Sequence, residues 1–168
     1  MFLNSKGCGI MPTTGADLYR AIHNGTYEGD QFVKDEKPVA GVLYPRFENT
    51  TYVDAQGIER ESLADVAVHS LPTGDEVDKG GGTSMFDVRG WFGFADWGYF
   101  HVPKGTEYPD SLFIKAGKSI RANKSGKLRG RHYQIEPKNR MTVAGYKGAL
   151  DNFARNAVVQ QIKLAKGE

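Results

Sequence analysis

The sequence has little cysteine and no long hydrophobic run. Its 168 residues include one cysteine, Cys8, which excludes an internal disulfide and an all-thiolate zinc site. The longest apolar run, residues 39–43, contains a glycine and is far shorter than the roughly 20 residues that span a bilayer. The N-terminus also lacks the apolar segment of a secretory signal. We therefore expect a protein without a membrane span or signal peptide, which works in a reducing cytoplasm and leaves its cell, if at all, by a signal-independent route.

Motifs for bound phosphates and metals are absent as well. Gly117-Lys118-Ser119 resembles the end of a phosphate loop, but Leu112 stands where that loop needs its first glycine. The four histidines are scattered singly, and no His-Glu-x-x-His occurs. We therefore expect neither a phosphate loop nor a metal site.

Charge is present in both signs but is unevenly distributed. Residues 1–100 hold eight basic and fifteen acidic residues, whereas residues 101–168 hold fourteen basic and five acidic ones. Residues 115–131, here called the basic stretch, contain seven basic residues and no acidic residue. Such a stretch is typical of a solvated loop, of a surface for nucleic acid or a phosphate-bearing cofactor, or of a docking surface for an acidic protein.

The distribution of hydrophobic residues favours an α+β fold. We expect strands within residues 17–23, 98–102, 112–114 and 132–136. Residues 58–71 suggest a short helix followed by a strand, and residues 74–82 suggest a loop. The clearest helix is the last element, where apolar residues recur at helical spacing; they are Tyr146, Leu150, Phe153, Ala157 and Ile162.

The domain organisation that we expect is simple. Residues 1–15 are small and polar, which is typical of a flexible N-terminal arm. Residues 16–168 contain no low-complexity linker and no internal repeat, so they are expected to form a single domain.

Two segments near strand positions have side chains that could bind an anion or a ligand. Arg20 lies inside an apolar segment, either as a planar fork for a phosphate or carboxylate, or as an edge residue that reaches solvent. Three glycines, residues 80–82, precede Thr83 and Ser84. This pattern fits a hydroxyl pair on a loop pressed against a ligand, or a flexible loop that ends in a helix cap.

A third segment, residues 132–136, has an unusual distribution of polar residues. On a strand, His132, Gln134 and Glu136 share one face, and Tyr133 points to the other. The pattern fits either a strand with one solvated face or a polar group that lines a site next to the basic stretch.

Taken in order, these segments resemble the ADP-ribosyltransferase superfamily, and within it the type VI secretion effector toxins that depend on NAD and act in the cytoplasm of a target cell. The resemblance covers roughly residues 17–161. It implies an ADP-ribosyltransferase-like pair of split, bent β-sheets with a long C-terminal helix, and NAD bound in the cleft as a substrate. The motifs are Leu-Tyr-Arg-Ala at 18–21, Gly-Gly-Thr-Ser-Met-Phe-Asp at 81–87, Val-Pro-Lys-Gly-Thr at 102–106, His-Tyr-Gln-Ile at 132–135 and Leu-Asp-Asn-Phe-Ala-Arg-Asn-Ala at 150–157.

The resemblance also implies roles for single residues. Arg20 matches the arginine that holds the NAD phosphate or ribose, and Ser84 matches the serine that orients the nicotinamide ribose. Glu136, two residues after a glutamine, matches the glutamate that contacts a ribose hydroxyl, although His132 with Tyr133 resembles the branch that uses His and Tyr. The catalytic residues implied are Arg20, Ser84 and Glu136, and the NAD-binding residues implied are Tyr19, Arg20, Thr83, Ser84, His132, Tyr133 and Gln134.

The residue types suit this chemistry. Breaking the bond between nicotinamide and ribose produces an oxocarbenium-like transition state. It needs a negative group near the ribose, a cation for the phosphates and an aromatic face for nicotinamide. Glu136, Arg20 and Tyr133 fit these three roles.

The first interpretation is therefore an NAD-dependent toxin that transfers ADP-ribose to an unknown macromolecular acceptor, with NAD hydrolysis as a close variant. One alternative is a nucleic-acid-binding or RNA-cleaving toxin that uses the basic stretch, with His132 and Glu136 as acid and base. Another is a non-catalytic protein that presents its terminal helix to a partner. A toxin that can harm its producer needs neutralisation, so we also expect a cognate immunity protein, acidic enough to dock on the basic stretch.

Overall fold

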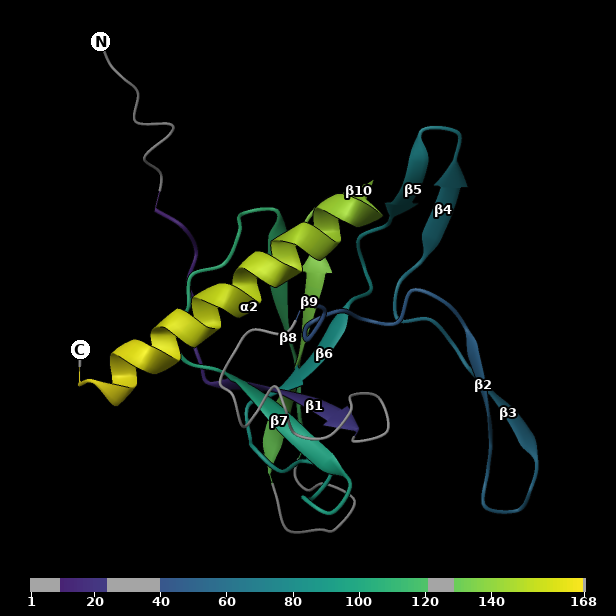
Figure 1. Ribbon diagram of the computed structural model, residues 1–168, viewed down its shortest axis with the longest axis horizontal. Coiled ribbons are helices and arrows are strands. Elements are labelled where there is room, and N and C mark those ends of the chain that lie inside the picture. Colours follow the sequence, from purple (N-terminus) through teal and green to yellow (C-terminus); the bar gives the residue numbers. More distant parts are fainter. Residues whose placement is uncertain (1–9, 24–39, 121–128, 168) are drawn as a thin grey trace.

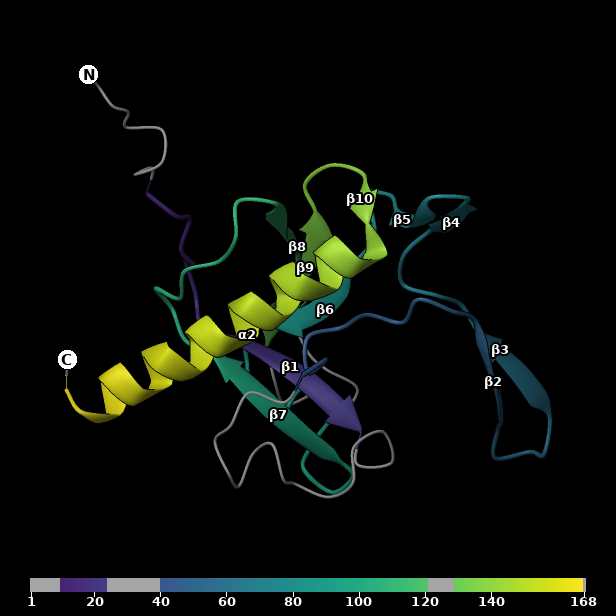
Figure 2. The ribbon, with the colours of Figure 1, turned by 45° about the horizontal axis from the view of Figure 1, so that its top comes forward.

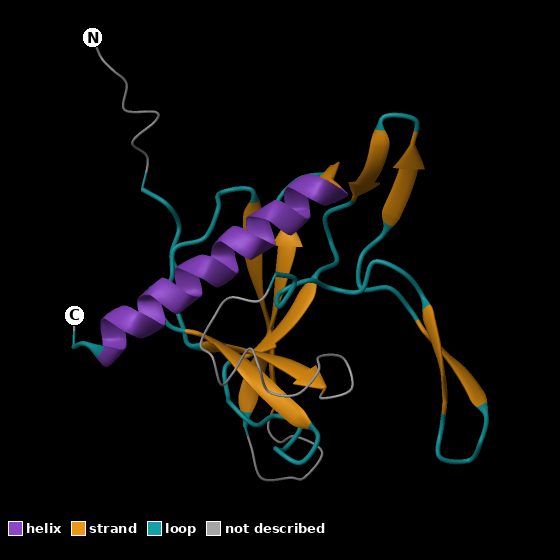
Figure 3. Cartoon of the chain, in the orientation of Figure 1, coloured by secondary structure: helices purple, strands orange, loops and turns teal. Residues whose placement is uncertain are grey.

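The computed structural model describes residues 10–23, 40–120 and 129–167 of the chain. The fold is α+β, as the sequence predicts: strands form three sheets, and a long helix lies across the largest one (Figures 1 and 3). The elements are β1 Leu18–His23, β2 Thr50–Val53, β3 Glu59–Ser62, β4 Val68–Leu71, β5 Gly74–Val77, β6 Thr83–Phe86, β7 Trp97–Val102, β8 Leu112–Ile120, β9 Gly130–Pro137, β10 Met141–Thr142 and α2 Val143–Ala165.

The main sheet has five strands in the order β7-β1-β6-β9-β8, and all neighbours are antiparallel. β1 pairs with β7 along its whole length, but it pairs with β6 only where Tyr19 faces Phe86. The sheet therefore consists of two ribbons, β7–β1 and β6–β9–β8, which diverge beyond that pair (Figure 2). Among the strands of the described residues, none pairs with this edge of β1 from Arg20 onward.

The helix α2 confirms the clearest prediction from the sequence. It begins after Thr142, whose hydroxyl accepts a hydrogen bond from the amide of Gly145 at 3.0 Å and so satisfies a free donor of the first turn. Tyr146, Leu150 and Phe153 are fully buried in the core between the helix and the main sheet. Ile162, which the sequence places on the same stripe, is exposed near the end of the helix.

Residues 58–77 differ from expectation. The helix predicted at the start of 58–71 is absent, and 74–77 form a strand rather than a loop, because two hairpins, β2–β3 and β4–β5, occupy this region. The carboxylate of Asp54 accepts hydrogen bonds from two amides of the first turn and pairs with Arg60 at 2.8 Å, so a local turn prevails over the helix propensity of the charged residues that follow. In the second hairpin, Gly74 follows the turn and has a φ of 127°, a conformation that glycine adopts readily.

The other strands expected from the sequence are confirmed, since β1, β7, β8 and β9 occupy the predicted segments. Residues 1–9 of the expected arm and residues 121–128 of the basic stretch lie outside the described residues. Thr14, also in the expected arm, is buried, and its hydroxyl donates to the carbonyl of Pro103 at 2.8 Å. In the part of the chain that the structure describes, no helix is long and apolar enough to cross a membrane.

Candidate functional site

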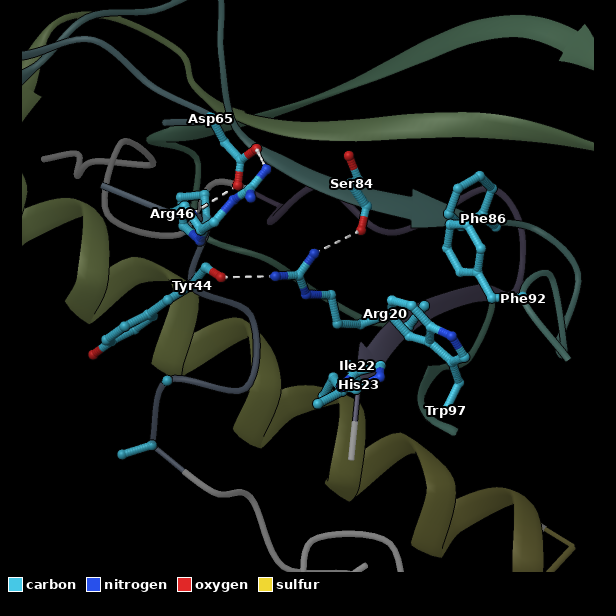
Figure 4. Close-up of a pocket in the computed structure, with 14 residues that line it drawn as sticks. Arg20, Ile22, His23, Tyr44, Arg46, Asp65, Ser84, Phe86, Phe92 and Trp97 are labelled. Atoms are coloured by element: carbon cyan, nitrogen blue, oxygen red, sulfur yellow. Dashed lines mark hydrogen bonds and ion pairs between the residues drawn. The ribbon is translucent and has the colours of Figure 1, made fainter. Parts of the chain in front are cut away.

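A cavity of about 720 Å³ lies where β1 and β6 diverge (Figure 4). Four consecutive residues of β1, Arg20–His23, line it together with Ser84 and Phe86 of β6. Because successive strand side chains point to opposite faces, four consecutive lining residues place the cavity along the edge of β1 that faces β6. Its volume is within the range of roughly 300–1,000 Å³ typical of small-ligand sites.

Arg20 brings the first two sequence motifs together. Its half-buried guanidinium donates a hydrogen bond to the carbonyl of Tyr44 at 2.9 Å and another to the carbonyl of Ser84 at 3.3 Å (Figure 4). Both of these acceptors are uncharged main-chain oxygens. The side chain therefore crosses the gap between the two ribbons and places its positive charge at the cavity.

The wall opposite β1 is the turn Gly41–Tyr44 and the residues that follow it. The Gly41 carbonyl accepts a hydrogen bond from the Tyr44 amide at 3.0 Å. The turn is attached to the sheet by the hydroxyl of Thr83, which donates to the Leu43 carbonyl at 2.6 Å. It is attached to α2 by Asp151, whose carboxylate accepts hydrogen bonds from the Gly41 amide at 3.0 Å and the Tyr44 hydroxyl at 2.7 Å.

A second arginine and a carboxylate also line this wall. Arg46 pairs with Asp65 at 3.3 Å, and the Arg46 amide donates to the same carboxylate at 2.7 Å. Arg46 is about half exposed and also contacts the Ser62 hydroxyl. The side chain of Arg46 is therefore engaged by a carboxylate at the outer part of the cavity.

Aromatic side chains form the remaining wall. Phe92 stacks on Trp97 with ring centroids 4.6 Å apart, and Phe86 meets the edge of Phe92 at 5.5 Å. The turn that carries Phe92 is fixed by the Tyr99 hydroxyl, which accepts from the Phe92 amide at 2.8 Å and donates to the Gly93 carbonyl at 2.7 Å. The cavity thus has a cationic end and an aromatic end.

The third sequence motif lies beside the cavity on β9. Gln134 faces Ser84 across the strand pair, and it donates a hydrogen bond to the buried carboxylate of Glu136 at 3.0 Å. His132 faces Phe86 and meets its ring edge-on at 5.4 Å. Burial lowers the pKa of His132, which favours the neutral imidazole. None of these three residues lines the cavity itself, but each is at most one strand away from a residue that does.

Two comparisons with known proteins bear on the chain. The family model described as Tse2 ADP-ribosyltransferase toxin matches residues 16–162. The chain belongs to the Tse2 ADP-ribosyltransferase toxin family. Toxin Tse2 of Pseudomonas aeruginosa is 33% identical over 164 residues, covering 92% of this chain and 95% of that toxin. The resemblance to type VI secretion effector toxins is thereby confirmed, and so are the expected activity, NAD-dependent ADP-ribosyl transfer, and the expected substrate, NAD.

Three further residues implied by the resemblance do not line the cavity either. Thr83 is fully buried and holds the Leu43 carbonyl. Tyr133 lines a separate pocket of about 230 Å³ beside Leu18. Tyr19 stacks on His101, with ring centroids 4.8 Å apart. For each of them the structure gives a contact within the protein.

Two of the three glycines before Thr83, Gly81 and Gly82, are close to the protein's own backbone. A Cβ added to Gly81 would lie 2.3 Å from the Asp65 carbonyl oxygen, and one added to Gly82 would lie 1.9 Å from that of Ile135. Thr83 opens a strand, so the helix cap considered from the sequence is absent. Gly81 and Gly82 allow a close approach, as expected, but the group that approaches them is the backbone of a neighbouring strand or loop and not a ligand.

Several residues that line this cavity are not predicted from the sequence. Tyr44, Arg46 and Asp65 lie in segments without a recognisable motif. Phe92 and Trp97 lie in the aromatic, glycine-containing segment just before the strand predicted at 98–102. The density of aromatic residues there is the one signal that indicates a ligand-facing wall. Among the described residues, no group of three or more His, Cys, Asp or Glu side chains could hold a metal ion.

Proposed function

We propose that NAD binds in the cavity between β1 and β6, with its diphosphate held by Arg20. The observation that carries this proposal is the convergence of Arg20 and Ser84, from different strands, on one cavity of suitable size. A planar guanidinium can bind phosphate oxygens with two parallel hydrogen bonds. The two diverging ribbons fit an ADP-ribosyltransferase-like pair of split, bent sheets, and the cavity would be its cleft.

The chemistry assigned to the site is cleavage of the bond between ribose C1′ and the nicotinamide nitrogen. The bonding electron pair leaves with nicotinamide, and positive charge develops on the ribose. A nearby carboxylate stabilises that charge. In this proposal Glu136, on the strand next to the cavity, supplies the carboxylate. Ser84 at the cavity and Gln134, which faces it on that neighbouring strand, orient the ribose hydroxyls. The acceptor then forms the new bond to C1′ and loses its proton.

The aromatic wall suits the leaving group. Phe92 and Trp97 present ring surface at the end of the cavity away from Tyr44, and a nicotinamide ring can stack on such a face. These side chains would also exclude water from C1′, which favours transfer to an acceptor over hydrolysis. We assign the nicotinamide contact to them in place of Tyr133, which lines the separate pocket.

The experiment that tests the proposal is NAD titration of the purified protein, followed by measurement of nicotinamide release. Arg20→Ala should weaken NAD binding by roughly 10- to 150-fold, the equivalent of a charge-assisted contact of about 1.5–3 kcal/mol. Arg60→Ala is the matched control, because Arg60 lies on the β2–β3 hairpin and pairs with Asp54. If Arg20→Ala binds NAD as tightly as the parent protein, the assignment is wrong.

Membership of the toxin family supports a proposal for the site of action and for the partner. We propose that the chain acts in the cytoplasm of a target cell after signal-independent delivery. We also propose that an acidic immunity protein docks on the basic stretch, of which Lys115 lies on β8 opposite Gln134. A partner seated there would lie two strands from Ser84. Binding of a candidate partner should weaken with salt and block NAD binding; a complex that leaves NAD affinity unchanged would contradict this placement.

A further inference from the structure

The motif at residues 150–157 includes a carboxylate that the proposed chemistry does not use. Asp151 lies on α2, across the turn Gly41–Tyr44 from the cavity. Its two oxygens are divided between two groups of that turn: one accepts from the Gly41 amide at 3.0 Å, and the other from the Tyr44 hydroxyl at 2.7 Å. A single side chain of the helix therefore binds both ends of the turn.

The same turn provides one of the two main-chain oxygens that accept hydrogen bonds from the Arg20 guanidinium in the contacts described above. Tyr44 binds Asp151 through its hydroxyl and Arg20 through its carbonyl. Asp151, Tyr44 and Arg20 therefore form a continuous chain of contacts from α2 to the cavity. The turn is also held at Leu43, whose carbonyl accepts the hydrogen bond from Thr83. Gly41 adopts a φ of 88°, a conformation that glycine reaches without a steric penalty.

A lysine on the same face of α2 supports this arrangement. Lys147, one helical turn before Asp151, places its ammonium 5.5 Å from the centre of the Tyr44 ring and 5.0 Å from that of Phe47. The tyrosine ring is therefore held from its face by a cation and at its hydroxyl by a carboxylate. Movement of Tyr44 away from α2 would break both contacts and would carry the Arg20 acceptor with it.

We propose that Asp151 is a positioning residue for Arg20: it fixes the turn Gly41–Tyr44, and the Tyr44 carbonyl in turn fixes the guanidinium that binds NAD. The proposal rests on the proposed function of Arg20. It predicts that Asp151 influences NAD binding without touching NAD, and that this influence disappears when Arg20 is absent.

The test compares NAD affinity in four proteins: the parent, Asp151→Ala, Arg20→Ala and the double variant. Asp151→Ala removes both acceptors, while alanine retains the helix propensity of α2. We expect its NAD dissociation constant to rise about tenfold, with KM rising alike and kcat staying within about twofold, because a phosphate contact acts equally in the ground and transition states. In the Arg20→Ala background the same change should have an effect of less than about twofold.

Two further variants separate positioning from general stability. Asn156→Ala removes another hydrogen bond from α2, to the Glu107 carbonyl at 3.0 Å, far from the turn; it should leave NAD affinity unchanged. Asp151→Asn keeps one acceptor oxygen and should restore part of the affinity. If Asp151→Ala does not fold, Tyr44→Phe takes its place, since it removes the hydroxyl contact alone and keeps the carbonyl that binds Arg20.

The outcomes distinguish the two proposals. Parent-like NAD affinity in Asp151→Ala, with weakened affinity in Arg20→Ala, overturns the positioning role and leaves the NAD site in place. Equal losses from Asp151→Ala in the presence and absence of Arg20 overturn it as well, because the carboxylate then acts by another route. Parent-like affinity in Arg20→Ala overturns the proposed NAD site and the positioning role together.

Discussion

Gly82 provides a direct test of why three glycines precede the serine at the cavity. The constraint on Gly82 is space: an added Cβ would lie 1.9 Å from the Ile135 carbonyl oxygen and 3.1 Å from the Cα of Glu136. Both atoms belong to the backbone of β9, which cannot rotate away as a flexible side chain can. Gly82→Ala should therefore push β6 and β9 apart immediately before Thr83.

The size of the effect follows from these distances. Ordinary van der Waals contact begins at about 3.4 Å, so the methyl carbon and the carbonyl oxygen must separate by about 1.5 Å. A shift of that size breaks the nearest hydrogen bonds between the two strands. Two such bonds at about 1 kcal/mol each, with an overpacking cost of about 1–3 kcal/mol, give a loss of roughly 3–5 kcal/mol. For a domain of this length the melting temperature should fall by roughly 6–20 °C.

Thermal unfolding followed by circular dichroism measures this loss, with NAD affinity determined separately at a temperature where both proteins are folded. Gly148→Ala is the matched control, because Gly148 lies inside α2 and an added Cβ would meet nothing within 4 Å. That variant should gain roughly 0.5–1 kcal/mol from helix propensity. If Gly82→Ala has the same melting temperature as the parent protein and loses only NAD affinity, the glycine makes room for the ligand and the packing argument fails.

Three further predictions concern the strands around the cavity. Thr83→Val leaves the Leu43 carbonyl without its buried donor and should lower the free energy of unfolding in urea by about 1–3 kcal/mol, whereas Ser84→Ala should slow nicotinamide release at nearly unchanged stability. The opposite result would mean that Ser84 is the structural residue and Thr83 the ligand-binding one. Burial lowers the pKa of His132 below its ordinary 6.5, so the unfolded chain takes up the proton more readily, and the free energy of unfolding should fall from pH 7.5 to 5.5. The variant His132→Gln should lose less stability over this interval, and a loss equal to that of the parent protein would refute the argument. Trp97→Leu should weaken inhibition by nicotinamide more than it weakens binding of ADP-ribose, and equal effects would show that Trp97 does not contact the nicotinamide ring.

The elements that the sequence predicts well are those whose pattern is local. The stripe through Tyr146, Leu150 and Phe153 has one arrangement that buries it, so α2 follows directly from spacing. β1 is predicted because residues 17–23 mix apolar and polar side chains, and Arg20 is a candidate site residue because it interrupts an apolar segment. The helix expected after residue 58 fails because the Asp54 turn, with its hydrogen bonds to Gln56 and Ile58, favours a hairpin.

The roles of neighbouring residues depend on which face of a strand is buried, and a short motif does not contain that information. Thr83 and Ser84 both have hydroxyl groups, but the first points into the core and the second lines the cavity. Tyr133 and Gln134 also point to opposite faces of their strand: Tyr133 lines the separate pocket, and Gln134 faces Ser84. The turn Gly41–Tyr44 has no motif at all, because its importance comes from contacts with residues far away in the sequence, such as Asp151.

The order of strands in the main sheet has a consequence for how the protein is made. β1 is synthesised first, but its partners lie far downstream: Leu18 pairs with Val102, and Tyr19 pairs with Phe86. At roughly 5–20 residues per second, a ribosome needs about 4–16 s after residue 23 to reach residue 102. Until residue 86 is made, neither β6 nor β7 is available to pair with β1, and closing such distant contacts is slow even in a free chain. Because β1 and β6 both line the cavity, the cavity forms only late in synthesis. A nascent chain arrested before β6 would contain Arg20 but no cavity for it to line.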